Sequence, residues 1–243
     1  AGGQRFTYGQ LEADANRVAR ALLAEGLRPG DHAAVCAGNS YAYAAFHFGC
    51  AKAGLVLAHL NARFTADEFA GLVTHSDACL VAAGPQQAAM AESARARLPA
   101  VRRWIALPDE GTSSGAPAPW TEPFAAWMGR QSSDEPFFSH GAALTPEQPF
   151  QLLYTSGTTG TPKGALISHA AKVNQGTTHC LNLGLMAGDR IVSALPLYHQ
   201  YAQWLVLVCA PMAGATVVAQ PAFDPARTWD ALARQGITHL PAV

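Results

Sequence analysis

Short apolar runs that alternate with helix-like segments are the feature that most constrains the fold of this 243-residue chain. Between these runs, apolar residues recur three or four positions apart, the spacing of a helix that buries one face. Two parallel neighbouring strands must be joined by a crossover connection, which is usually a helix. The alternation therefore predicts an α/β fold with mostly parallel sheets flanked by helices. The first four predicted strands are 32–37, 55–59, 78–83 and 104–107.

Capping residues indicate where the predicted helices begin. Two threonines are followed three residues later by Gln or Glu, the capping-box pattern in which side chain and backbone bond reciprocally. A serine and an aspartate are further candidates, and a proline after the aspartate suits the first helical position. The four predicted N-caps are Thr7, Ser40, Thr65 and Asp224.

Two similar halves are predicted on either side of a polar segment. GLRPGD at 26–31 recurs as GLMAGD at 184–189, and each copy precedes a strand, a turn and an apolar helix. Two explanations of this recurrence remain: two βαβ units are similar by chance, or the two halves are related. We predict a first α/β subdomain at 1–107, a linker with one short helix at 108–148, and a second subdomain at 149–243. The second would begin with a phosphate-binding loop and be truncated at its C-terminal end.

Composition and charge exclude several classes of protein. Apolar residues make up 49% of the chain, charged residues 14%, and the net charge is −1. No run of Lys or Arg indicates a nucleic-acid partner, and prolines and glycines interrupt the uncharged stretch 191–223, so no transmembrane segment is expected. Five scattered cysteines without a C-x-x-C pair predict reduced thiols, and a cytoplasmic location.

The stretch YTSGTTGTPKG at 154–164 holds three glycines, five Ser/Thr hydroxyls and a lysine, groups that suit a polyphosphate. A plain solvated turn is the alternative. The Walker A pattern fails, because Pro162 stands where it needs glycine and Gly164 where it needs Ser or Thr. The flanking apolar runs 150–154 and 164–168 predict that the loop joins two strands as a hairpin.

This stretch resembles the phosphate-binding signature of the adenylate-forming superfamily, which contains acyl-CoA synthetases, peptide-synthetase adenylation domains and luciferases. Its pattern, approximately [YF]-[TS]-[SG]-G-[TS]-T-G-x-P-K-G, is met at every position. The segments 6–31 and 38–69 also resemble the family, with Asn39 and Asn61 in expected places, and LPLYHQYAQ at 195–203 resembles its histidine motif. The chain therefore looks like an N-terminal fragment of an AMP-dependent acyl-CoA synthetase.

The resemblance implies a role for each matching residue. The loop would close on the ATP phosphates, with Lys163 as a catalytic cation and the Thr158 hydroxyl on Mg²⁺. His199 would lie beside the adenylate and the acyl pocket as a second catalytic residue; a packed core histidine is the alternative. The implied ATP contacts are Thr155, Ser156, Gly157, Thr158, Thr159, Gly160, Thr161, Pro162 and Lys163.

The implied reaction is attack of a substrate carboxylate on the α-phosphorus of ATP, which releases pyrophosphate, followed by displacement of AMP by coenzyme A. Ala202, where the family often has glycine, hints at a fatty or other aliphatic acid. The family's later glutamate, aspartate and lysine segments are not found before Val243, where an apolar strand has only begun. We therefore expect a fragment that needs a C-terminal domain in cis and is inactive alone. A homodimer is a further expectation.

Three alternatives stay open. An amino-acid-activating adenylation domain usually reads S-G-S-T-G where this chain reads S-G-T-T-G. A non-catalytic phosphate-binding module would bind ATP without turnover. A kinase or NTPase would release ADP and phosphate in place of AMP and pyrophosphate.

Overall fold

The structure of the chain is a computed structural model that describes residues 3–108, 116–136, 144–155 and 163–241. A seven-stranded sheet has the order β5-β4-β3-β1-β2-β6-β7, and β8 and β9 form a second sheet. Neighbouring strands pair in parallel except β6 and β7, so the predicted fold class is confirmed. The strands are β1 His32–Cys36, β2 Val56–His59, β3 Ala78–Ala83, β4 Arg103–Ala106, β5 Glu122–Pro123, β6 Pro149–Thr155, β7 Lys163–Ser168, β8 Arg190–Ser193 and β9 Thr216–Ala219.

Helices begin where the capping residues predict them. Thr7 and Thr65 both close a full capping box, and the side chains of Ser40 and Asp224 accept bonds from the first turns of their helices. These caps satisfy backbone N–H groups that have no partner within the helix. The helices are α1 Tyr8–Ala24, α2 Tyr41–Lys52, α3 Ala66–His75, the 3₁₀ turn η1 Pro85–Gln87, α4 Ala88–Arg95, α5 Phe124–Gly129, α6 His169–Leu183, α7 Gln200–Ala202, the π-helix η2 Gln203–Cys209, α8 Ala210–Ala213 and α9 Pro225–Arg234.

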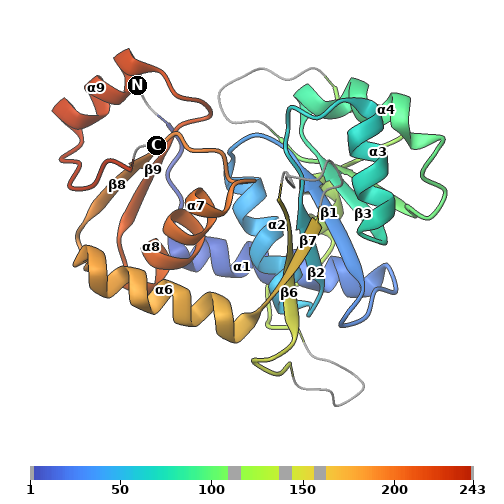
Figure 1. Cartoon of the computed structure of the whole chain (residues 1–243), viewed down its shortest axis with the longest axis horizontal. Coiled ribbons are helices and arrows are strands. Elements are labelled where there is room, and N and C mark those ends of the chain that lie inside the picture. The colour runs from blue at the N-terminus through green and yellow to red at the C-terminus, as the bar shows by residue number, and fades with distance from the viewer. Residues whose placement is uncertain (1–2, 109–115, 137–143, 156–162, 242–243) are drawn as a thin grey trace.

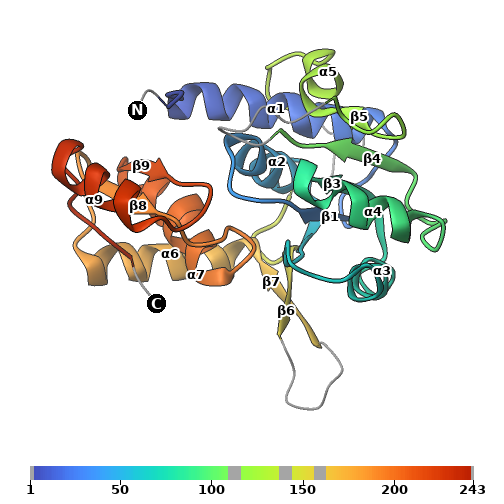
Figure 2. The ribbon, with the colours of Figure 1, turned by 90° about the horizontal axis from the view of Figure 1, so that it is seen from above.

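Hydrophobic cores cover both faces of the larger sheet. Successive strand residues point to opposite faces, so Ala33 and Val35 pack with α1, α2 and α5, while Ala34 and Cys36 pack with α3 and α4. Figures 1 and 2 show the sheet between these helices, with α6 to α9 and the second sheet beside it. Because both faces are covered, the central strands read as unbroken apolar runs.

The strand that precedes the glycine-rich loop belongs to the larger sheet. β6 pairs with β2 from Leu57↔Gln151 to His59↔Leu153, and β7 forms the edge beyond it. The division predicted at residue 149 assigns both strands to the second half, whereas the two sheets separate after β7. A local apolar pattern identifies a strand but not its partner, which explains the difference. The domain boundaries themselves stay a prediction.

The second sheet repeats the turn geometry of the first. Gly30 and Gly188 have φ angles of 92° and 96°, a region that favours glycine. The aspartate after each glycine accepts a backbone N–H at 2.8 Å, in Asp31 from Arg28 and in Asp189 from Met186. The similarity of the two hexapeptides thus extends to their conformation.

The apolar segment after β8 differs from the single α-helix that the sequence predicts. Its middle part, Gln203–Cys209, is π-helical. Pro211, shortly beyond it, lacks the N–H with which its position would close an α-helical turn. The strand expected near residue 240 makes a single bridge, Ile191↔His239.

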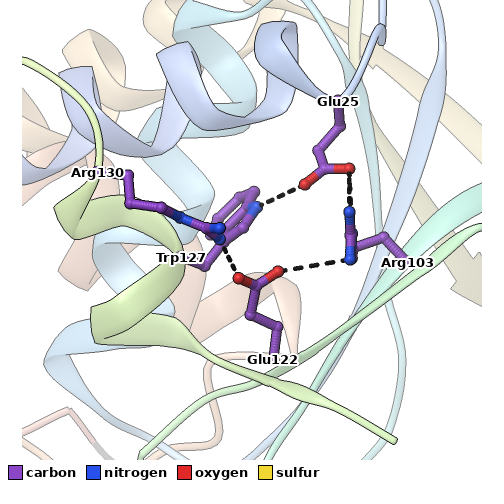
Figure 3. Close-up of polar contacts among 5 residues, drawn as sticks. All are labelled: Glu25, Arg103, Glu122, Trp127 and Arg130. Atoms are coloured by element: carbon purple, nitrogen blue, oxygen red, sulfur yellow. Dashed lines mark hydrogen bonds and ion pairs between the residues drawn. The ribbon is translucent and has the colours of Figure 1, made fainter.

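A chain of polar contacts among Trp127 and four charged side chains joins the C-terminal end of α1 to β4, β5 and α5 (Figure 3). Glu25 accepts bonds from Arg103 at 3.0 and 2.8 Å and from the Trp127 indole at 3.3 Å. Glu122 pairs with both Arg103 and Arg130. Hydrogen bonding to Glu25 raises the pKa of Arg103. The short helix predicted in the 108–148 segment, α5, is thereby fixed against α1.

The described residues contain neither a disulfide nor a helix suited to a membrane. All five cysteines are free, as their scattered positions predict. Of the helices in the described ranges, none has the combination of length and apolar character that a membrane crossing requires.

Gly49 allows α2 to lie against α1. A Cβ at this position would lie 2.3 Å from Val18 Cγ1 and 3.1 Å from the Ala15 carbonyl oxygen. We expect Gly49→Ala to lower the free energy of unfolding by about 1–3 kcal/mol, as overpacking does, measured by urea unfolding. Gly71→Ala in α3 is the matched control, because a Cβ there meets no atom within 4 Å; it should raise stability by roughly 0.4–1 kcal/mol. Equal effects of the two substitutions would contradict this explanation.

Candidate functional site

The two strands that flank the glycine-rich loop form an antiparallel hairpin, as the apolar runs 150–154 and 164–168 predict. β6 and β7 pair up to Thr155↔Lys163, so these two predicted site residues lie side by side where the loop leaves and returns. The Lys163 side chain is exposed. The other predicted contacts, Ser156, Gly157, Thr158, Thr159, Gly160, Thr161 and Pro162, lie outside the described residues, and their roles stay predictions.

Tyr154, the first residue of the signature, fixes the hairpin to α3. Its hydroxyl lies 2.9 Å from His75 Nδ1 and 3.5 Å from the Leu72 carbonyl oxygen. Burial raises the pKa of the Tyr154 phenol to about 12, so it stays neutral near pH 7. Gly164 lies opposite Tyr154, where a Cβ would meet Leu152 Cδ1 at 2.7 Å. These contacts fix the base of the hairpin and give the signature's tyrosine and last glycine a packing role.

His199 is exposed and occupies the N-cap position of α7. Its backbone N–H donates to the Pro196 carbonyl at 2.9 Å, and its own carbonyl accepts from Gln203 at 3.1 Å. Its ring centroid lies 4.7 Å from that of Tyr198. An exposed ring on a backbone fixed at both ends is available to a ligand, unlike the packed core histidine that was the alternative.

Asn39 fixes the segment that carries His199. Its amide group donates to the Leu195 carbonyl at 2.9 Å and the Gln220 carbonyl at 3.1 Å, and its oxygen accepts from the Leu197 N–H at 2.8 Å. The side chain is buried, so these three backbone groups would otherwise lack partners. Sequence reasoning placed Asn39 through family resemblance but gave it no role. The G-N-S turn before a capped helix is the local signal that marks it.

A buried pair of amides joins the loop hairpin to the helix after His199. Gln151 on β6 donates from Nε2 to Gln203 Oε1 at 3.1 Å. The same Nε2 lies 3.1 Å from His59 Nε2, and His59 Nδ1 lies 2.6 Å from the Tyr43 hydroxyl. The chain of polar groups thus runs from η2 through β6 and β2 to α2. Sequence reasoning missed it, although a single Gln in the apolar run F-Q-L-L-Y is a visible signal.

Burial favours the neutral forms of the ionisable side chains in and beside this buried polar network. Desolvation, with a smaller contribution from the Lys172 charge, lowers the pKa of His59 to about 3. Desolvation also lowers the pKa of His47 and raises that of Tyr43. Within the described ranges, no three His, Cys, Asp or Glu side chains gather where they could hold a metal ion.

We expect acid to destabilise the fold through His59. Its folded pKa of about 3 lies below the ordinary value of 6.5, so between these pH values the unfolded chain binds a proton that the folded chain does not. Stability therefore falls as pH drops through this window, by up to about 1.4 kcal/mol per pH unit from this residue. His59→Gln should reduce the slope of unfolding free energy against pH by that amount. An unchanged slope would contradict the assignment.

Comparison with known proteins gives one family. The family model described as AMP-binding enzyme matches residues 1–243. A long-chain-fatty-acid–CoA ligase, FadD13 of Mycobacterium tuberculosis, is 29% identical, and the match covers 96% of this chain and 43% of that protein. A fatty acid–[acyl-carrier-protein] ligase, ScoC of Streptomyces coeruleorubidus, is 33% identical over 97% of this chain and 43% of its own length.

A solved structure agrees with these matches. The crystal structure of ATP-bound MatB from Rhodopseudomonas palustris superposes with a TM-score of 0.83 at 26% identity, covering 99% of this chain and 44% of that one. The chain thus spans less than half the length of these relatives. On the match of the family model over its whole length, the chain belongs to the family of AMP-binding enzymes.

Proposed function

We propose that the protein containing this chain activates a carboxylic acid with ATP and transfers the acyl group to a thiol. The supporting observation is the complete signature at 154–164, carried on a hairpin that pairs Thr155 with the exposed Lys163. The names of two relatives support the same proposal. One is named a CoA ligase and the other an acyl-carrier-protein ligase, and both names specify fatty acids. We propose a fatty or other aliphatic acid as substrate and coenzyme A as the acceptor.

In the proposed first step, a carboxylate oxygen of the acid bonds to the α-phosphorus of ATP, and the bond from that phosphorus to the β-phosphate oxygen breaks. Pyrophosphate leaves with the electron pair of that bond. Lys163, at the loop's return, would neutralise charge on the departing phosphates, and the loop N–H and hydroxyl groups would hold them. Mg²⁺ would arrive bound to ATP and contact the Thr158 hydroxyl. Such a step depends on positioning and charge neutralisation more than on covalent help.

His199 is proposed to lie against the acid and the adenylate. Its ring is exposed, and Asn39 fixes the backbone before it. In this role the imidazole covers the reacting carboxylate and hydrogen-bonds to it. Asn39 is then a positioning residue, which acts through the conformation of the histidine segment.

The alternatives differ in their products. An amino-acid-activating adenylation domain would also release pyrophosphate but only with an amino acid. A phosphate-binding module would bind ATP without turnover, and a kinase would form ADP. A cytoplasmic location and a homodimer stay predictions.

Lys163→Ala in the full-length protein should lower kcat/KM for acid-dependent pyrophosphate release by about 100-fold, the usual cost of removing one group that stabilises transition-state charge. The melting temperature should not change, because the side chain is exposed. The control is Lys52→Ala, which removes a lysine paired with Glu12 at 2.6 Å on another face. Release of ADP, or equal rates in both variants, would contradict the proposal. ATP binding by calorimetry without any turnover would favour the non-catalytic module.

The 243-residue chain alone is expected to form no acyl-adenylate. It spans 43% of the length of the relatives it matches, so most of such an enzyme is not contained in it. Mass spectrometry of the chain incubated with ATP, Mg²⁺ and a panel of acids checks this. Detection of an acyl-adenylate would refute it.

A further inference from the structure

Lys172 is a buried cation without a partner. It lies on α6, its residue is 3% exposed, and its Nζ has no hydrogen-bond partner among the described residues. None of the ion pairs in the described ranges includes it. Burial lowers the pKa of Lys172 to about 8, which leaves most of the side chain charged near pH 7. Burial of an isolated ammonium group costs free energy, so a lysine in this position is expected to pair with an anion.

Among the described residues, the ionisable groups that interact with Lys172 supply no negative charge. The ionisable groups that interact with it are His47 and His59, which burial keeps neutral, and Cys209, a thiol whose pKa burial raises to about 12. His169, the remaining base nearby, interacts with His47.

Other polar atoms of the same region also lack partners. They are His47 Nδ1, Gln151 Oε1 and Gln203 Nε2, each buried. Gln151 contacts both His59 and Gln203 at 3.1 Å, and the His47 and His59 rings lie 5.3 Å apart. With the lysine these groups offer more donors than acceptors, which suits a carboxylate. We call this set the Lys172 cluster: His47, His59, Gln151, Lys172 and Gln203.

Gln203, one member of the cluster, follows His199 by one helical turn along the chain. Gln203 donates its backbone N–H to the His199 carbonyl at 3.1 Å, and it is the first residue of the π-helix η2. π-Helical segments are rare and frequently lie at functional sites. Four residues along a helix rise by about 6 Å, so the backbones of His199 and Gln203 lie close together.

Close packing of α6 on η2 brings Lys172 to this place. A Cβ at Gly176, one turn after Lys172, would lie 2.5 Å from Val208 Cγ1 and 2.9 Å from Met212 Sδ. Only glycine allows the two helices to approach this closely without displacing those side chains. The lysine therefore lies between helix and sheet and not in solvent.

We propose that the Lys172 cluster binds a second carboxylate, carried at the far end of the acid substrate. The substrate is then a short aliphatic dicarboxylic acid, with one carboxylate beside His199 and the other at the cluster. This inference rests on the proposed function. One carboxylate attacks ATP near His199, and the other pairs with Lys172 and accepts from the Gln203 amide.

The test compares acids of equal length on the full-length protein. Pyrophosphate release is measured with succinate, glutarate and adipate and with butanoate, pentanoate and hexanoate. The wild type should prefer the dicarboxylates. Lys172→Met should lower the ratio of kcat/KM for the dicarboxylates to that for the monocarboxylates by at least about 30-fold, the lower range for removal of one partner of a buried charge pair. The variant should fold at least as well as the wild type, because it removes an uncompensated charge.

Lys52→Met is the matched control and should leave the ratio of the two acid classes unchanged. Thermal unfolding of each variant confirms that it is folded, and Gln203→Leu serves as a second variant with the same expected loss of dicarboxylate preference. The inference fails if the wild type releases pyrophosphate at least as well with monocarboxylates as with dicarboxylates, and Lys172→Met leaves the ratio of the two rates unchanged. In that case the cluster holds only water or an acidic group from another part of the protein. If no acid of either class supports pyrophosphate release, the proposed function fails instead.

Discussion

The pairing of β6 with β2 is the interaction on which the candidate site depends. It attaches the hairpin with the glycine-rich loop to a sheet covered on both faces, so the loop begins and ends on a rigid support. The same pairing brings Gln151 next to His59, so the buried polar chain exists only when this register is correct. A shift by one residue would turn the alternating side chains of β6 to the opposite faces. Register thus fixes both the loop and the groups beneath it.

The side chains of Asn39 and Gln203 are among the contacts that join the second half of the chain to this support. Asn39 bonds to three backbone groups around the histidine segment and the end of β9, and Gln203 bonds to Gln151 across the boundary between the halves. Along the chain, His199 lies between Leu197, which bonds to Asn39, and Gln203, which bonds to Gln151. The exposed ring therefore has a fixed backbone although it makes few contacts itself. The candidate site thus lies where two parts of the chain meet, and each part contributes one of the two predicted catalytic residues, Lys163 and His199.

Features that depend on neighbouring residues could be predicted from the sequence. Thr7 and Thr65 cap their helices as expected, and the GLRPGD and GLMAGD turns agree because glycine and aspartate decide them locally. Features that depend on distant partners could not. The apolar pattern of β6 is the same whichever sheet it joins, and a buried Lys172 is indistinguishable in sequence from a solvated one. His199 was identified only through a motif, because its exposed ring leaves no periodic signal.

The contacts of Asn39 also have a consequence for the order of folding. They join residues separated by 156 to 181 positions, whereas the caps and turns of each half involve close neighbours. Closing a chain segment of that length costs entropy before any contact is gained. The three bonds of Asn39 therefore need both halves of the chain in place, whereas the caps and turns do not. The pairing of β6 with β7 needs no contact across that separation, so this hairpin does not depend on the placement of His199.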